Sequence, residues 1–158
     1  MEGREGGSAA AGWGLAVGLA VTTAGLDQAT KAAVRSTVTR GDRSDLALGL
    51  DLVHVQNTGI AFGLFARYSA LLTALIMIAL AVLLGYFALH ASRRLLWVPT
   101  GLMLGGAAGN LIDRARLGAV TDFLDPPWWP AFNLADAAIT VGVLALVAAL
   151  DLAREHPA

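Results

Sequence analysis

The 158-residue sequence has no cysteine and few charged residues (15%), whereas 56% of its residues are hydrophobic. The absence of cysteine excludes disulfides, thiolate nucleophiles and Cys-ligated metal sites. The net charge of −1 gives no reason to expect nucleic-acid binding. A mean hydropathy of +0.64 is too high for an ordinary soluble domain of this length. We therefore expect a single integral-membrane domain covering residues 1–158.

Four apolar segments have the length and composition of membrane-crossing helices. We expect these spans at about residues 10–28, 69–90, 95–112 and 131–151. The first could instead be a cleaved signal peptide, but its apolar stretch is long and the residues before it carry two Glu against one Arg. The third contains overlapping Gly-x-x-x-Gly patterns at Gly101, Gly105 and Gly109, which let neighbouring helices approach closely.

The segments between the spans, about 32–66 and 113–130, contain charged and turn-forming residues. Gly41-Asp42 is typical of a turn. Residues 46–55 are expected to form one short strand with a bulge at Gly49. Residues 126–130, Pro-Pro-Trp-Trp-Pro, predict a rigid turn that carries interfacial aromatic side chains. The fold class is therefore an all-α membrane protein with four transmembrane helices and a small region outside the bilayer.

Four spans place both termini on one side of the membrane, together with the basic connector at 90–94. That side carries Arg4, Arg93, Arg94 and Arg154, and the opposite side carries the other seven basic residues. Acidic residues intersperse those seven. The distribution of positive charge therefore does not decide the orientation.

Polar residues gather where helices meet the membrane surface. Asp27 and Lys31 are spaced i,i+4 and can pair, and from spacing alone we favour a solvated ion pair at the interface. Asn57 begins an Asn-Thr-Gly stretch that is either an ordinary hairpin turn or a donor and acceptor for a substrate backbone.

A second group of polar residues surrounds the fourth span. Asp113 beside Arg114 is most simply a salt-bridged helix end, and Asp125 before two prolines is most simply a turn residue. Asp136 is different, because a carboxylate inside a span costs about 2.5–3.5 kcal/mol on insertion scales. Paired with Asp122 at the same membrane surface, it forms a two-carboxylate site that keeps one proton. Such a pair supplies a general base for water and a general acid for a leaving nitrogen.

Five motifs in order along these spans resemble the bacterial lipoprotein signal peptidases (signal peptidase II), small four-span aspartic peptidases. They are Asp27-Gln28-x-x-Lys31, Asn57-x-Gly59-x-Ala61-Phe62, Gly109-Asn110-x-x-Asp113-Arg114, Val120-Thr121-Asp122-Phe123 and Phe132-Asn133-x-Ala135-Asp136. Each motif alone is weak, but all five in this order are highly specific.

The resemblance implies a role for each matching residue. Asp122 and Asp136 would be catalytic; Asn57, Asn110, Arg114 and Asn133 would orient the substrate; Asp27, Lys31, Gly59 and Asp113 would support the site. It also implies an extracytoplasmic β-cradle near residues 40–60, cytoplasmic termini and a location in the bacterial cell membrane. The expected reaction removes the signal peptide of prolipoproteins just before a diacylglyceryl-modified cysteine. We expect no cofactor or metal, no nucleic-acid partner, contact with membrane lipid, and a monomer.

Other functions remain possible from the residues alone. A metal-dependent intramembrane hydrolase would use Asp113, Asp122, Asp125 and Asp136 as oxygen ligands. A small proton or cation transporter would use Asp136 as a relay, and would spread its polar groups through the depth of the membrane. An assembly factor would use the Gly-x-x-x-Gly faces, but that leaves the Asn, Asp and Arg cluster unexplained.

Overall fold

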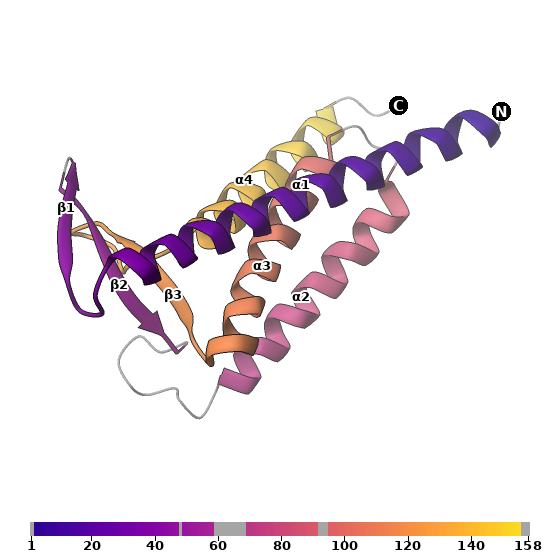
Figure 1. Cartoon of the computed structure of the whole chain (residues 1–158). Coiled ribbons are helices and arrows are strands. Elements are labelled where there is room, and N and C mark those ends of the chain that lie inside the picture. The colour runs from indigo at the N-terminus through magenta and orange to yellow at the C-terminus, as the bar shows by residue number, and fades with distance from the viewer. Residues whose placement is uncertain (1, 48, 59–68, 92–94, 156–158) are drawn as a thin grey trace.

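Four helices lie alongside one another with a small antiparallel sheet at one end, in a computed structural model that describes residues 2–47, 49–58, 69–91 and 95–155 (Figure 1). The helices are α1 (Glu2–Thr37), α2 (Ser69–His90), α3 (Trp97–Leu117) and α4 (Leu134–Glu155). The first residues of α1 and the last residues of α4 lie at the end of the bundle opposite the sheet (Figure 1). The prediction of a mostly helical chain with a small strand-containing region is confirmed.

The helices do not all have the limits expected for the spans. α2 matches residues 69–90, whereas α1 continues past residue 28 through Lys31 to Thr37. Two helical segments among the described residues are long and apolar enough to cross a membrane, Ala9–Thr37 and Leu134–Leu152. A shorter apolar stretch covers Ile78–His90. The structure thus identifies two clear candidate spans, and the four-span arrangement stays a prediction.

Glycines on α3 allow the close packing of helices predicted from the Gly-x-x-x-Gly pattern. A Cβ atom at Gly105 would lie 2.6 Å from the carbonyl oxygen of Ala20 on α1. One at Gly106 would lie 2.5 Å from the carbonyl oxygen of Ala135 on α4. Because no side chain intervenes, α3 contacts the backbones of both neighbours and lies between them.

Three strands form the sheet in the order β1–β2–β3, with β1 at Arg43–Ala47, β2 at Leu50–Asn57 and β3 at Val120–Asp125. The single strand expected at 46–55 is wrong, because these residues belong to two strands of a hairpin. Gly49 lies between them with φ of +78°, a conformation that glycine adopts without steric cost. Gly41 has φ of +84°, which agrees with the predicted turn.

The pairing of β2 with β3 brings residues distant in sequence to one place. Asn57 lies opposite Val120, and Val55 lies opposite Asp122, so Asn57 and Asp122 are diagonal neighbours on one face. An irregularity in register between Leu52 and Val55 precedes this pairing. Without that one-residue shift, the side chains at the end of β2 would point to the other face of the sheet.

The segment after β3 folds back on the strand before α4 begins. The amide of Trp129 donates to the carbonyl of Pro126 at 3.4 Å, which confirms the turn predicted for Pro-Pro-Trp-Trp-Pro. Phe132 then bonds with Leu124 in both directions, each at 2.9 Å. This closure places the first residues of α4 directly beside the residues of β3.

The packing at Gly105 gives a test of the helix contacts. We expect Gly105→Ala to lower the free energy of unfolding by about 1–3 kcal/mol, because the new methyl group overpacks the contact with α1. The control is Gly25→Ala on α1, where no atom of the described residues lies within 4 Å of an added Cβ. That change should be neutral or stabilising. Thermal unfolding in detergent compares the two, and equal midpoints would contradict the packing.

Candidate active site

Asn133 connects the two candidate catalytic aspartates through a single amide group. Its Oδ1 accepts a bond from the backbone amide of Asp136 at 3.0 Å. Its Nδ2 donates to Oδ1 of Asp122 at 2.6 Å. The Asp136 carboxylate in turn accepts from the backbone amide of Asn133 at 3.4 Å. These reciprocal bonds form a capping box at the start of α4, so the cap of this helix also orients both carboxylates.

Asp122 is almost completely buried at the end of the sheet. Its side chain is 2% exposed, and its Oδ2 accepts a bond from Nδ2 of Asn57 at 2.9 Å. Burial, with a further contribution from the nearby Asp136 charge, raises the pKa of Asp122 to about 6, although the Asn57 and Asn133 donors oppose that rise. A carboxyl with this pKa holds its proton more readily than an ordinary aspartate does.

Asp136 is held by a second amide, from α3. Nδ2 of Asn110 donates to Oδ1 of Asp136 at 2.8 Å, and Oδ1 of Asn110 accepts from Nζ of Lys31 at 2.8 Å. Because an ammonium group only donates, it fixes which end of the Asn110 amide faces Asp136. Lys31 therefore acts on the candidate site through Asn110.

The Asp27–Lys31 pair is entirely buried. The two side chains are 2.8 Å apart and neither is exposed, so the expected pairing is present but the expectation of a solvated pair is wrong. The bundle covers the pair because α1 continues beside α3 and α4. Oδ1 of Asp27 also accepts a bond from the backbone amide of Ala135 at 2.9 Å, which satisfies a free donor in the first turn of α4.

Gly109 is required by this arrangement. A Cβ atom at position 109 would collide with the carboxylate of Asp27. The glycine of the Gly109-Asn110 motif therefore leaves room for an acid from α1.

Asp113 holds α1 and β3 together and does not form the expected salt bridge with Arg114. Its side chain is 1% exposed and accepts bonds from the backbone amide of Thr121 at 2.9 Å and from Gln28 at 3.1 Å. Its ion pairs are with Lys31 at 3.8 Å and Arg35 at 3.5 Å. Helical spacing predicted a local pair, but residues of α1 lie closer in space.

Arg114 is half-buried, and its Nη1 lies 3.4 Å from the backbone oxygen of Asn110 on its own helix. Its predicted contact with substrate stays a prediction. Gly59, the other supporting residue named from the motifs, lies outside the described residues.

Sequence reasoning assigned no role to Gln28, Arg35 or Thr121, which complete the network. Gln28 bonds the backbone oxygen of Gly109 at 3.0 Å, and Arg35 bonds Oγ1 of Thr121 at 3.1 Å. The available signal was spacing, since Asp27, Lys31 and Arg35 recur every four residues and share one face of a helix that continues to Thr37.

Asp125 lies apart from the candidate pair. It ends β3 and pairs with Arg43 of β1 at 2.5 Å, so it is a strand-end residue and not only a turn residue. Within the part of the chain that the structure describes, no three His, Asp or Glu side chains gather as metal ligands. Two of the four acids considered as metal ligands therefore have other partners. Asp125 pairs with Arg43, and Asp113 belongs to the network around Lys31.

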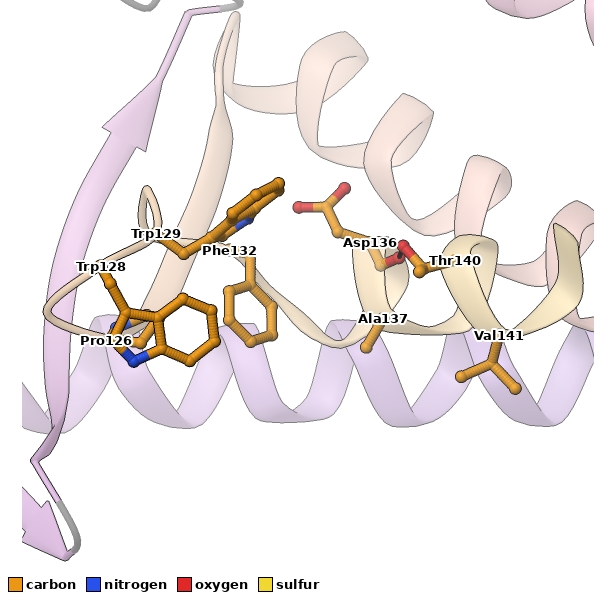
Figure 2. A pocket seen from close by; sticks show the side chains of 8 residues that line it. All are labelled: Pro126, Trp128, Trp129, Phe132, Asp136, Ala137, Thr140 and Val141. Atoms are coloured by element: carbon orange, nitrogen blue, oxygen red, sulfur yellow. Dashed lines mark hydrogen bonds between the residues drawn. The ribbon is translucent and has the colours of Figure 1, made fainter. Parts of the chain in front are cut away.

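A groove opens beside Asp136 on the outer face of α4. Its volume is about 370 Å³, and its walls are the aromatic turn and the first two turns of the helix (Figure 2). Figure 2 shows the Asp136 carboxylate pointing toward the ring of Trp129 at one end of the groove. The candidate pair is thus accessible from this side through Asp136, while Asp122 is covered.

The motifs of this site recur in a known family. The family model for signal peptidase (SPase) II matches residues 19–152, which include every residue of the network described above. This chain belongs to the signal peptidase II family. Among related signal peptidases, a lipoprotein signal peptidase of Pelotomaculum thermopropionicum is 43% identical over 127 residues, covering 79% of this chain and 84% of that protein. One from Moorella thermoacetica is 42% identical over 131 residues, covering 81% and 87%.

Two solved structures share the fold of this chain. A bacterial membrane enzyme solved by the in meso method has a TM-score of 0.79 and 31% identity, covering 87% of this chain and 92% of that one. A second such enzyme has a TM-score of 0.81 and 29% identity, covering 92% of each chain.

The buried ion pair gives a test of the network. We expect Lys31→Met to lower the free energy of unfolding by about 3–5 kcal/mol, because it leaves the Asp27 carboxylate buried without its counter-ion. The double variant Asp27→Asn/Lys31→Met should lose less, since neither charge of this pair remains and the amide oxygen introduced at position 27 can still accept from Ala135. Denaturant unfolding of Lys31→Met, of Asp27→Asn and of the double variant measures the coupling energy between the two residues. Additive losses would contradict a direct buried pair.

Proposed function

We propose that this chain is a membrane aspartic endopeptidase that removes signal peptides from prolipoproteins by cleaving just before the diacylglyceryl-modified cysteine. The observation that carries the proposal is the bridge through Asn133, which ties a buried Asp122 to Asp136 at the start of α4. Membership of the signal peptidase II family and the names of its lipoprotein signal peptidase members support the substrate class.

The two carboxyls have different environments, which suits them to different roles. Asp122 has the raised pKa and keeps the proton of the pair, because burial disfavours its charged form. Asp136 lies in the first turn of α4, where the helix dipole favours negative charge. We assign Asp136 as the base that takes a proton from water, and Asp122 as the acid that protonates the leaving nitrogen.

The surrounding amides would position the reactants. Asn110 and Asn133 hold the carboxyls so that a water molecule can lie between them, and Asn57 holds Asp122 from the sheet side. When that water attacks the scissile carbonyl, its proton passes to Asp136 and the C–N bond breaks to release an amine. Arg114 and Asn57 are the residues we assign to the substrate backbone.

The membrane arrangement follows from the same proposal. All four helices would cross the bilayer, with the termini cytoplasmic and the sheet end, which carries the site, at the extracytoplasmic face of the bacterial cell membrane. The start of α1 and the end of α4 lie at the same end of the bundle in Figure 1, which supports this topology. The polar network lies at the end of α1 and the start of α4, which favours chemistry at the surface over a relay through the membrane. The protein would act as a monomer and take no nucleic acid.

Cleavage of a diacylglyceryl-modified prolipoprotein tests the catalytic assignment. We expect Asp122→Asn and Asp136→Asn each to lower kcat by at least about a thousandfold, because each removes one proton-transfer group. The matched control is Asp125→Asn, which changes an acid of the same strand that pairs with Arg43. It should cleave at nearly the wild-type rate.

A chelator belongs in the same assay. Unchanged activity in its presence agrees with an aspartic pair, whereas complete inhibition would favour a metal-dependent hydrolase. Full activity in either site variant would refute the pair.

The pH dependence tests which carboxyl carries the proton. Since Asp122 must be protonated, kcat/KM should fall as the pH rises through about 6 in the free enzyme. Asn57→Ala removes a donor that stabilises the charged form, so it should raise the pKa of Asp122 and move this alkaline limb to higher pH. Profiles of kcat/KM for the two proteins measure the shift, and a shift to lower pH would contradict the assignment.

A further inference from the structure

The last turns of α1 carry Arg35 to the strand that holds Asp122. The helix continues beyond Lys31 to Thr37, and its end contacts β2 and β3 (Figure 1). Arg35 lies four residues after Lys31, on the same face of the helix. Its Nη1 donates to Oγ1 of Thr121 at 3.1 Å, and Thr121 immediately precedes Asp122 in β3. Arg35 therefore contacts the chain directly beside a candidate catalytic carboxyl.

Arg35 and the Asp122 carboxyl lie on opposite faces of β3. Successive side chains of a strand point to opposite faces, so the Thr121 hydroxyl points away from the face that carries Asp122. On that face, Asn57 and Asn133 donate to the two oxygens of Asp122 at 2.9 and 2.6 Å. On the other face, Arg35 holds the side chain of Thr121, which has no exposure to solvent. Within the described residues Arg35 bonds neither candidate catalytic carboxyl, so its contact with the site is the strand itself.

Asp113 fixes the backbone of the same residue. Its Oδ2 accepts from the backbone amide of Thr121 at 2.9 Å, and its Oδ1 lies 3.5 Å from Nη1 of Arg35. Thr121 is thus held by its amide and by its hydroxyl, and it cannot move along the strand without losing a bond. Asp113 also pairs with Lys31 at 3.8 Å and accepts from Gln28 at 3.1 Å. Removing the Arg35 guanidinium therefore leaves Asp113 with a cation, so the chain should still fold.

We propose that Arg35 is a positioning residue for the carboxyl pair, and that it sets the place of Asp122 through the Thr121 hydroxyl. The inference rests on the proposed function, since it concerns the geometry of that same pair. Asp136 is held by the start of α4, whereas Asp122 depends on the position of β3, which Arg35 ties to α1. Two groups that act on one water molecule need close alignment, and a displacement of about 1 Å can lower a rate about a hundredfold.

Cleavage of a diacylglyceryl-modified prolipoprotein by the purified full-length chain tests the inference. Arg35→Met removes the guanidinium and leaves the buried Thr121 hydroxyl without its donor. We expect kcat to fall by about 10- to 100-fold and KM to stay within about twofold, because the carboxyl pair is misaligned while the substrate contacts remain. Arg40→Met is the matched control, since Arg40 is an exposed arginine that follows the same helix. It should cleave at the wild-type rate.

Substitutions at Thr121 show whether Arg35 acts through the hydroxyl. Thr121→Val keeps the β-branched shape and the amide bond to Asp113 but removes the acceptor, so kcat should fall by a similar factor. Thr121→Ser keeps the hydroxyl and should lower kcat by less than about threefold. The double variant Arg35→Met/Thr121→Val should lose no more than the more impaired single variant, because both changes break the same contact.

Thermal unfolding of each variant in detergent separates positioning from stability. If Arg35→Met lowers the unfolding midpoint but leaves kcat of the folded protein unchanged, the arginine only stabilises the fold and the inference is wrong. A higher KM at unchanged kcat would make Arg35 a substrate contact, which also overturns it. Losses that multiply in the double variant would mean that Arg35 does not act through Thr121. Failure of the wild-type chain to cleave the substrate would instead overturn the proposed function itself.

Discussion

Lys31 carries an ammonium group with no exposure to solvent, and the surrounding helices are arranged to satisfy it. Its partners are Asp27 on its own helix and Asn110 and Asp113 on α3. Each partner also makes a second contact, since Asp27 caps α4, Asn110 holds Asp136, and Asp113 binds the first residues of β3. An unpaired buried charge costs several kcal/mol, so these contacts must form together. The two candidate catalytic carboxyls are thus positioned by an ion pair that takes no part in the proposed proton transfers.

Much of the architecture could be predicted from the sequence, because the length of an apolar segment and the presence of turn-forming residues determine structure locally. Residues 69–90 formed a helix with the expected limits, and Gly41 and the Pro126–Pro130 stretch formed turns. The strand limits were wrong at Gly49, because the leucines around it do not reveal that two short strands pair with each other. The hairpin depends on the backbone at Gly49, whose φ of +78° lets the chain turn, and the spacing of apolar residues does not report a backbone angle.

At the candidate site, spacing in the sequence could predict contacts within one helix turn, but it could not predict contacts between different helices. Asn133 and Asp136 belong to one motif of the sequence, and the structure adds that their bonds form a capping box. Asp113 was expected to pair with its neighbour Arg114 and instead pairs with α1. The burial of Asp27 and Lys31 also depends on three helices at once. Such features arise from tertiary packing, where the nearest charge in space is not the nearest in sequence.

The bond between the Ala135 amide and Asp27 joins residues separated by 108 positions. During synthesis, α1 is complete long before α4 exists, so the acid meets this donor only when the last helix arrives. Until then Lys31 lacks part of its surroundings, and Asp136 has not been made. The order of insertion therefore delays assembly of the carboxyl pair until α4 has left the ribosome. While it is still a nascent chain beside other proteins entering the membrane, such a peptidase has not yet assembled its proposed site.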